Sequence, residues 1–486
     1  MIFDFKEYLN RTGEIGFVSK TVSSLIFVEG LPGATLHEVV VFESGDIGEV
    51  IALSSSVVSV LSFSKDPVRV GMRVARIGKN LQIPVGERLF GKVINPLGRS
   101  IDPGRPVPSG TEFRAIRKSP PGIIDRAIIS EQCETGMALI DLLMPIGKGQ
   151  RELVLGDQKT GKSMVLMRTL LSQVTQGAVG IYAVIGKGKI AIKQVEETLT
   201  NFGILDRVIT VVTSADDGPG MMYATPYSAM TIAEYFRDVG RNVVLVLDDL
   251  STHARIVREI ALLGKRFPGR NSYPGDIFYT HASLLERAGN FSGKNGPVSI
   301  TCLPVAETVQ GDMTGYIITN LMSMTDGHLY FDHLLFAEGR RPAVDVFLSV
   351  TRVGRQTQTP LRLEIGRTVI PFLRKAADFR NFASFGSELG PHIKDVLEKE
   401  ERLNEFFDQT VYHTIPGNLQ LILFGFAWGE IWRGKTRMEV RIEIQKLVYS
   451  YASDVALRKR MDAYISRCDS IESLLTGLQQ FDFSKK

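Results

Sequence analysis

The chain has 486 residues, a formal net charge of +4 at pH 7, and a composition of 44% apolar and 23% charged residues. This composition is that of a soluble globular protein, and the length exceeds one hydrophobic core, so roughly two to four domains are expected. The small net charge argues against a dedicated nucleic-acid binder. The three cysteines, Cys133, Cys302 and Cys468, have no metal-ligand spacing, which predicts reduced thiols in a cytosolic protein.

Short apolar segments fill the N-terminal part of the chain, from about Gly13 to Ile77. They are separated by Gly, Ser or Asp and read GEIGFVSK, SSLIFVEG, HEVVVFES, IGEVIALS and VVSVLSF. Several short strands at regular spacing are typical of a small β-barrel or sandwich. We therefore expect a β-barrel domain over residues 1–84. The first residues lack the basic and apolar regions of a signal peptide.

Strand and helix patterns alternate over residues 85–373. Five continuous apolar runs indicate strands that are buried on both faces, at residues 152–157, 179–186, 208–214, 242–249 and 299–305. Helical patterns lie between them, for example at Ser163–Gln173 and Lys193–Asn201. This alternation predicts an α/β domain with a parallel sheet.

Strand patterns end near residue 373, and residues 374–486 read as amphipathic helices. Glu398 and Arg402, four residues apart, support an exposed helix face. The apolar run Leu419–Trp428 is much shorter than the roughly 20 residues that span a bilayer, so it predicts a buried helix. Association with a membrane is therefore expected only through partners.

A glycine-rich phosphate-binding motif lies in the middle of the α/β region. Residues 156–163 read GDQKTGKS, follow an apolar strand and open a helical run, as the pattern G-x-x-x-x-G-K-[ST] requires. In this context backbone N–H groups and the positive end of the helix dipole face the phosphates of a nucleotide. Lys162 reaches the outer phosphates, and Ser163 offers a hydroxyl to Mg²⁺. ATP binding is therefore assigned to Gly156, Asp157, Gln158, Lys159, Thr160, Gly161, Lys162 and Ser163.

Two carboxylates end the apolar run at residues 242–249. Asp248 is expected at the carboxyl end of its strand, where ligands of α/β sheets bind, and from there it would hold Mg²⁺, usually through water. Asp249 fits better as a turn or helix cap. The glycine-rich loop and this strand together predict a nucleotide site.

Hydrolysis of the nucleotide needs a residue that positions or activates water, commonly a carboxylate. The expected place is the loop after the strand at 179–186, which reads Gly186-Lys187-Gly188-Lys189 and contains no acid. The next acids, at 196 and 197, fall within the following helical run. Because a charged lysine cannot accept a proton from water, the sequence predicts a site that binds a nucleotide and holds it.

Longer stretches extend these motifs over nearly the whole chain. They read FESGDIGEV (42–50), FGKVINPLGRSID (90–102), SPPGIIDR (119–126), TGMALIDLLMPIGKGQRELVLGDQKTGKS (135–163), LDDLSTHA (247–254), PGRNSYPGDIFYTHASLLERA (268–288), TNLMSMTDG (319–327) and GRRPAVDVFLSVTRVG (339–354). In this order they resemble the alpha subunit of F-type ATP synthase. The resemblance implies an N-terminal β-barrel, a central RecA-like P-loop domain and a C-terminal all-α domain.

In that family three alpha and three beta subunits alternate in a ring around a gamma central stalk, and the catalytic sites lie mostly on beta. The resemblance implies a regulatory ATP-binding subunit that couples ATP synthesis or hydrolysis to proton (or sodium) transport, at the cytoplasmic face of an energy-transducing membrane. The beta signature, GGAGVGKT with a catalytic glutamate, is absent. Alpha usually has glutamine at that glutamate's position, and this chain has Lys187.

The resemblance also assigns a role in trans. Arg352, in the motif SVTRVG, matches the alpha arginine that reaches into a neighbouring beta site and stabilises the transferring phosphoryl group. Without the surrounding motif, an interface or surface ion pair would be the ordinary role of such an arginine.

Other matches concern the adenine pocket and the peripheral stalk. Arg341, Pro342 and Gln409 match alpha positions near the adenine, whereas a second pocket glutamine is replaced by Val411, which leaves base selectivity open. The barrel begins close to the N-terminus, so the segment that docks the delta subunit and the peripheral stalk is expected to be shortened, remodelled or missing.

Two other hexameric ATPases are alternatives. A self-sufficient ATPase of the secretion-system type would need a catalytic glutamate where this chain has Lys187. An RNA-translocating ATPase of the Rho kind would need a barrel with exposed aromatic side chains and a basic groove. The barrel segment has Phe17, Phe27, Phe42 and Phe63, mostly at positions expected to be buried, so no nucleic-acid partner is expected.

Overall fold

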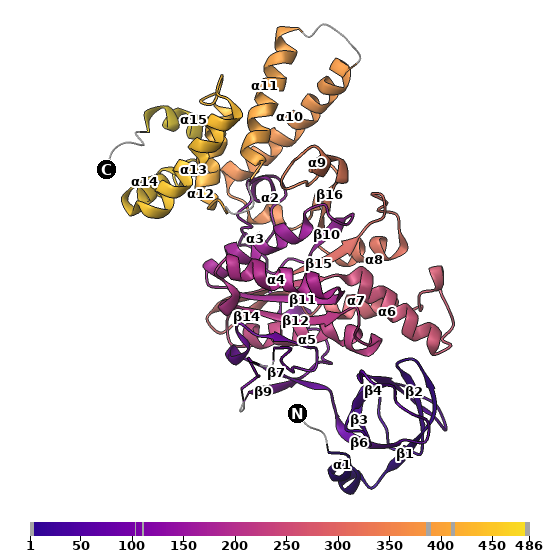
Figure 1. Ribbon diagram of the computed structural model, residues 1–486. Coiled ribbons are helices and arrows are strands. Elements are labelled where there is room, and N and C mark those ends of the chain that lie inside the picture. Colours follow the sequence, from indigo (N-terminus) through magenta and orange to yellow (C-terminus); the bar gives the residue numbers. More distant parts are fainter. Residues whose placement is uncertain (1–3, 103, 109–110, 385–389, 410–413, 482–486) are drawn as a thin grey trace. The chain divides into compact units, whose positions relative to one another are not determined.

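The computed structural model describes residues 4–102, 104–108, 111–384, 390–409 and 414–481 (Figure 1). The chain divides into two compact units, each built from separate stretches of the sequence. The first contains Met1–Ala127, Gly177–Glu307 and Asp312–Thr325, and the second contains Ile128–Gln176, Thr308–Gly311 and Asp326–Lys486. The domain boundaries expected near residues 84 and 373 stay predictions.

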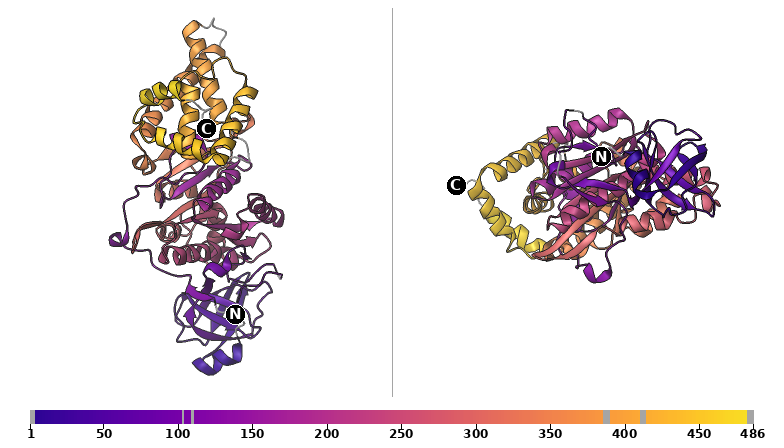
Figure 2. Two further views of the ribbon diagram at one scale, coloured as in Figure 1. Left: turned by 90° about the vertical axis from the view of Figure 1, so that its left-hand side faces the viewer. Right: turned by 90° about the horizontal axis from the view of Figure 1, so that it is seen from below.

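A closed barrel of antiparallel strands begins the first unit (Figures 1 and 2). Around the barrel the strands follow the order β1-β2-β5-β4-β3-β6. Their bounds are β1 (Ile15–Val22), β2 (Leu25–Glu29), β3 (Glu38–Phe42), β4 (Ile47–Leu53), β5 (Val58–Ser62) and β6 (Arg73–Asn80). Side chains such as Val40, Val50 and Val60 fill the interior and are fully buried. The barrel confirms the predicted N-terminal fold, and β6 adds a strand to the five that were expected.

Helix α1 (Phe5–Thr12) precedes the barrel and packs beside β6 (Figure 1). Asp4 caps it, because its side chain accepts a hydrogen bond from the backbone N–H of Lys6. A two-stranded ribbon, β7 (Gln82–Val85) with β9 (Glu112–Ala115), follows the barrel in the chain.

A parallel sheet forms the rest of the first unit. Its strands run in the order β15-β13-β11-β12-β8, and β14 pairs antiparallel with β15. The strands are β8 (Val93–Ile94), β11 (Val179–Lys187), β12 (Val208–Ser214), β13 (Val243–Asp248), β14 (Gly289–Gly293) and β15 (Gly296–Glu307). Apart from their last residues, β11, β12 and β13 are buried throughout, as the apolar runs predict for parallel strands.

Helices cover this sheet, and a buried ion pair links the end of one helix to another. The helices are α4 (Lys189–Asn201), α5 (Pro219–Asp238), α6 (Leu250–Leu263), α7 (Ile277–Leu285) and α8 (Tyr316–Met324). Arg287, just after α7, donates to both carboxylate oxygens of Glu234 on α5, at 3.0 and 2.8 Å. It also donates to Thr231 and to the carbonyl of Ile116, at 2.9 and 3.0 Å. Both side chains of the pair are 2% exposed, and these partners satisfy the hydrogen-bonding groups of the guanidinium.

Further strands and helices belong to the second unit. Strand β10 (Glu152–Gly156) pairs in parallel with β16 (Gly327–Phe331), and β17 (Val350–Thr351) pairs antiparallel with β16. The helices of this part are α2 (Ala138–Leu143), α3 (Lys162–Thr175) and α9 (His333–Ala337). Here β10 leads directly into the glycine-rich loop and α3, as the motif predicts.

Helices form the C-terminal part of the second unit. They are α10 (Pro360–Ser384), α11 (Pro391–Phe407), α12 (Gly417–Trp428), α13 (Arg437–Ser453), α14 (Val455–Ile465) and α15 (Ile471–Gln480). Helices α10 and α11 lie side by side (Figure 1). Helix α12 is buried along most of its length, which confirms the prediction for Leu419–Trp428. No helix in the described part of the chain is long and apolar enough to cross a membrane.

Replacing Arg287 with leucine leaves the Glu234 carboxylate buried without its partner, a change that costs about 3–5 kcal/mol in comparable buried pairs. We expect a lower unfolding midpoint and faster hydrogen exchange at the amides of α5. The double variant Arg287→Leu/Glu234→Leu should recover much of the loss. Glu87→Gln, which removes an exposed ion pair with Arg241, is the control and should change neither measurement. An unchanged midpoint in Arg287→Leu would contradict a structural role for the pair.

Candidate nucleotide-binding site

Two glycines of the phosphate loop occupy positions that other residues would strain. Gly156 has a φ of 153°, and a Cβ there would lie 2.5 Å from the carbonyl oxygen of Phe331 on the neighbouring strand β16. Gly161 has a φ of 90° and stands immediately before α3. These conformations let the backbone turn sharply from β10 into the helix, which leaves the first N–H groups of α3 without intrahelical partners.

Asp157 fixes the loop through hydrogen bonds to residues outside it. Its carboxylate accepts hydrogen bonds from the hydroxyl of Thr308 at 2.5 Å and from the backbone N–H of Gly311 at 3.0 Å. Partial burial alone would raise the pKa of Asp157, but these hydrogen bonds outweigh the burial and lower the pKa below its usual value. The hydroxyl of Thr160 closes the turn by donating to the Asp157 carbonyl at 2.7 Å. Asp157 therefore shapes the loop from within the protein.

Lys162 lies folded against its own loop. Its ammonium donates to the carbonyl oxygens of Gly156 and Asp157, at 2.8 and 2.5 Å. The residue is only 8% exposed, so the charge sits close to the backbone amides of the loop. Ser163, on the first turn of α3, is exposed, as are Gln158 and Lys159 at the tip of the loop. A cation and a helix N-terminus at one turn form a site for an anion such as a phosphate.

Lys187 and Asp248 form an ion pair at the carboxyl ends of β11 and β13. The ammonium lies 2.5 Å from Oδ1 of Asp248, and the hydroxyl of Tyr182 donates to Oδ2 at 2.8 Å. The Asp248 side chain is 4% exposed and that of Lys187 is 26% exposed. Tyr182 is fully buried and was not among the residues predicted for the site, because a single tyrosine within an apolar strand gives no signal of its own.

A shift in the register between β11 and β12 directs Lys187 toward the Asp248 carboxylate. β11 pairs regularly with β12 as far as Val184, and the register then shifts before Lys187 pairs with Ser214. Gly186, within the shift, has a φ of 63°, and its N–H donates to the hydroxyl of Thr213 at 3.2 Å. Such irregularities re-aim side chains at the ends of strands.

Asp249 caps helix α6, as its position after the strand suggested. Its carboxylate accepts from the backbone N–H of Thr252 at 2.6 Å and from the Thr252 hydroxyl at 3.2 Å. Burial raises the pKa of Asp249 to about 6, and the nearby carboxylates of Glu307 and Asp248 add to the rise.

The two residues predicted to hold Mg²⁺ differ in how well they fit a metal ion. Ser163 presents an exposed hydroxyl, which suits a single ligand position. Each oxygen of Asp248 already accepts a hydrogen bond, one of them from a cation, so this carboxylate does not fit a magnesium site. Within the described residues, no group of three or more His, Cys, Asp or Glu side chains is placed to hold a metal.

Arg352 projects from a tightly held turn in the second unit. Its backbone N–H donates to the Asp326 carbonyl at 3.1 Å, and the hydroxyl of Thr351 donates to the Pro145 carbonyl at 2.8 Å. A Cβ on Gly354 would lie 1.7 Å from the same Pro145 carbonyl, so the chain passes too close there for any other residue. The Arg352 side chain is exposed, and no described residue forms an ion pair with it. The structure thus presents a fixed backbone with a guanidinium facing outward.

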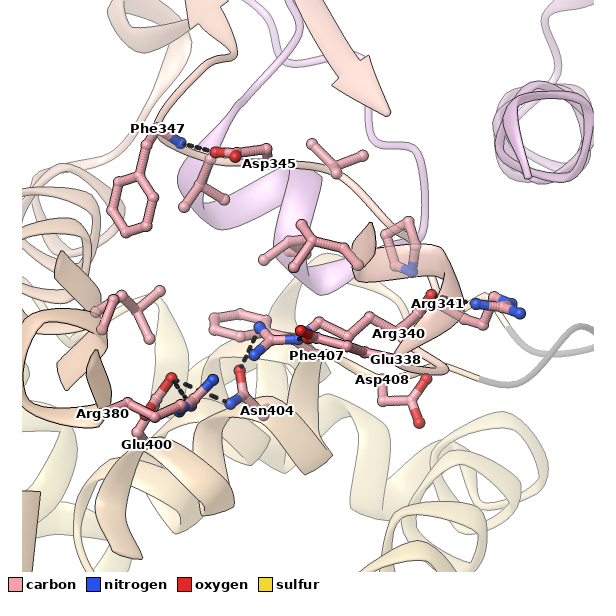
Figure 3. A pocket seen from close by; sticks show the side chains of 17 residues that line it. Glu338, Arg340, Arg341, Asp345, Phe347, Arg380, Glu400, Asn404, Phe407 and Asp408 are labelled. Atoms are coloured by element: carbon pink, nitrogen blue, oxygen red, sulfur yellow. Dashed lines mark hydrogen bonds and ion pairs between the residues drawn. The ribbon is translucent and has the colours of Figure 1, made fainter. Parts of the chain in front are cut away.

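A pocket of about 190 Å³ lies beside the segment that contains Arg341 and Pro342, and both residues line it (Figure 3). Arg340 points toward Asn404, to which it donates at 3.2 Å, whereas Arg341 points away from that residue (Figure 3). The Arg341 guanidinium stacks on the ring of Phe336, 3.6 Å from its centre. Phe407, the last residue of α11, and Asp408, which follows it, also line the pocket.

Gln409 is held by backbone groups. Its side-chain oxygen accepts from the N–H of Ala138 at 2.6 Å, and its side-chain nitrogen donates to the carbonyl of Gly136 at 3.0 Å. Its own N–H donates to the carbonyl of Arg341 at 2.8 Å. Gln409 therefore links the start of α2 to the pocket segment, and Val411, the other position matched to the adenine pocket, lies outside the described residues.

The strand, glycine-rich loop and helix, with a carboxylate ending a second buried strand, define a nucleotide-binding protein of the P-loop class. Residues 136–351 match the nucleotide-binding domain of the ATP synthase alpha/beta family. The chain is 41% identical over 396 residues to ATP synthase subunit alpha 1 of Paraburkholderia xenovorans, covering 81% of this chain and 78% of that protein. It is 39% identical over 424 residues to ATP synthase subunit alpha of Dictyoglomus thermophilum, covering 87% and 83%. The corresponding protein of Helicobacter acinonychis is 38% identical over 439 residues, covering 90% and 87%. The chain belongs to the ATP synthase alpha subunit family.

Lys162→Met should weaken ATP binding by about tenfold to a hundredfold, because hydrogen bonds from a charged donor are worth about 1.5–3 kcal/mol. Methionine keeps the length and burial of the side chain but removes the ammonium. Titration of the full chain with a fluorescent ATP analogue measures the change. Lys148→Met is the control, because Lys148 pairs with Glu131 outside the loop and should bind as the parent does. Equal affinity in Lys162→Met would show that this lysine does not contact the nucleotide.

Proposed function

We propose that this chain is the regulatory, non-catalytic ATP-binding subunit of a rotary F-type ATP synthase. It alternates with beta subunits in a ring of three alpha and three beta subunits around the gamma stalk. The assembly couples ATP synthesis or hydrolysis to proton (or sodium) transport at the cytoplasmic face of an energy-transducing membrane, which the chain contacts only through the complex. Family membership and the geometry of the phosphate loop support this proposal.

One observation carries the non-catalytic part of the proposal. After β11, where hydrolysis requires a residue that activates water, the chain has Lys187, whose ammonium is bound to Asp248. An ammonium in an ion pair has no lone pair to accept a proton from water. The same observation weighs against a self-sufficient secretion-type ATPase, which needs a carboxylate at this place.

In this proposal, different residues bind the phosphates, the accompanying Mg²⁺ and the adenine of ATP. The loop at 156–163 holds the phosphates, with Lys162 as the principal cation and Ser163 as a hydroxyl ligand for Mg²⁺ that arrives with ATP. Arg341 and Pro342 contact the adenine, since they line the pocket beside Phe407. Gln409 positions their segment through its hydrogen bond to the Arg341 backbone.

Arg352 acts on the neighbouring subunit in this proposal. A guanidinium that is exposed, on a turn fixed by Asp326 and Pro145, is suited to enter a site on a partner. There it would stabilise charge on the transferring phosphoryl group, as arginine fingers supplied in trans do. Family membership supports a beta subunit as that partner.

Arg352→Ala should lower the ATPase rate of the complex with beta by about a thousandfold or more, the usual contribution of such an arginine. ATP binding by the lone chain should not change, because the residue acts on the partner's nucleotide. Steady-state hydrolysis by the reconstituted complex and ATP titration of the lone chain measure the two effects.

Arg355→Ala is the matched control for this variant. Arg355 is exposed on the same turn, and its loss should leave the rate within about threefold of the parent complex. Steady hydrolysis by the lone chain, abolished in Lys162→Met, would overturn the non-catalytic assignment. An active Arg352→Ala complex would overturn the role in trans.

A further inference from the structure

Helix α9 lies beside the phosphate loop, and both belong to the second unit. A Cβ on Gly161 would lie 3.4 Å from the ring of Phe336, which belongs to α9. Toward the other end of the loop, Nδ1 of His333 on α9 lies 3.7 Å from Oδ2 of Asp157. The helix therefore places an imidazole next to the carboxylate that the loop contains.

The Asp157 carboxylate is a negative charge within a loop that binds anions. Partial burial raises the pKa of Asp157, but hydrogen bonds from Thr308 and Gly311 lower it. The positive charges of His333 and Lys162 lower it further, so the pKa lies below its usual value and the carboxyl group is ionised at neutral pH. An ionised carboxylate at this place repels phosphate groups, and a cation beside it offsets the repulsion.

The two oxygens of Asp157 have different surroundings. Oδ1 accepts hydrogen bonds from Thr308 at 2.5 Å and from Gly311 at 3.0 Å, whereas Oδ2 accepts only the longer contact of 3.1 Å from Gly311 and faces His333. The His333 side chain is 50% exposed, so its ring can exchange a proton with solvent. Histidine rings change charge between about pH 5 and pH 8. A protonated ring at this distance forms an ion pair with Asp157.

Other titratable groups surround this pair. Asp332, which precedes α9, accepts hydrogen bonds from two backbone N–H groups of that helix at 2.7 and 2.9 Å. Burial and nearby carboxylates raise the pKa of Tyr330, so its hydroxyl stays neutral. Lys162 donates to backbone carbonyls of the loop. Of these residue types, only histidine ordinarily changes its charge between about pH 6 and pH 8.

From this geometry we infer that His333 is a further residue of the nucleotide site, and that its protonated ring is the counter-ion of Asp157, so that this chain binds ATP more tightly as the pH falls from about 8 to about 6. The inference rests on the proposed nucleotide site and adds to it a proton that binds together with ATP. The positive ring offsets the carboxylate and attracts the phosphates. As the pH rises the ring becomes neutral, and this attraction is lost.

The test measures the dissociation constant of ATP for the purified full chain, in excess Mg²⁺, at about pH 6 and about pH 8. Because ATP itself also takes up protons, the change with pH in the parent is divided by the change in His333→Gln, whose side chain is neutral at both pH values. We expect the parent's affinity to rise by about threefold to tenfold relative to this variant as the pH falls.

Two further variants separate the charge of the ring from other effects. His333→Lys carries a positive charge at both pH values, so it should bind tightly at both and show the same small pH dependence as His333→Gln. His392→Gln removes an exposed histidine of α11, which lies near Lys375, and should behave as the parent. Thermal unfolding checks that each variant folds, and His333→Asn serves as the neutral variant if the glutamine variant does not fold.

The outcomes distinguish the inference from the proposed function. An equal pH dependence of ATP binding in the parent and in the neutral variant overturns the inference and leaves the nucleotide site standing. Absence of ATP binding by the parent at both pH values overturns the proposed site, and the inference falls with it. A pH dependence that is lost in the neutral variant, together with tight binding by His333→Lys at about pH 8, supports both.

Discussion

The parallel pairing of β11 with β13 is the constraint on which the chemistry of the first unit depends. Their register aligns Val184 with Asp248, so the two strands reach the same edge of the sheet together. Apolar side chains fill both strands before that edge, and helix α5 packs against them. Charged groups are therefore confined to the strand ends, where they must find partners among themselves. The ion pair between Lys187 and Asp248 is the result.

Much of this arrangement could be predicted from the sequence, because the signals are local. The apolar runs gave β10 to β13 and β15 within a few residues, since parallel strands buried on both faces leave no polar positions. The loop motif predicted a strand, a turn and a helix from glycine spacing alone, and Gly156 and Gly161 have the positive φ angles that such a turn requires. Asp249 caps α6 because an aspartate at the first position before a helix accepts its free N–H groups.

Other features depend on contacts between distant residues and could not be predicted. β6 was missed because its sequence, RVARIGKN, alternates small or charged residues with few large apolar ones, and only closure of the barrel makes it a strand. The sequence predicts that Lys187 cannot act as a base, but its bond to Asp248 depends on a register shift that no spacing rule contains. Gln409 matched a family position, whereas its actual hydrogen bonds run to backbone groups of residues distant in sequence.

Lysine at position 187 affects both the acceptance of a proton from water and the charge of Asp248, whereas glutamine would affect only the first. Glutamine removes the proton acceptor but keeps the charge of Asp248, so a metal ion can still be attracted there. A charged lysine cannot accept a proton from water either, and its ion pair also neutralises the carboxylate. Different contacts hold Arg352. Its turn is fixed by Pro145 and Asp326, in the second unit of the chain. The phosphate loop lies in the same unit as Arg352, whereas Lys187 lies in the first unit, so a change at Lys187 need not disturb the turn that holds the arginine.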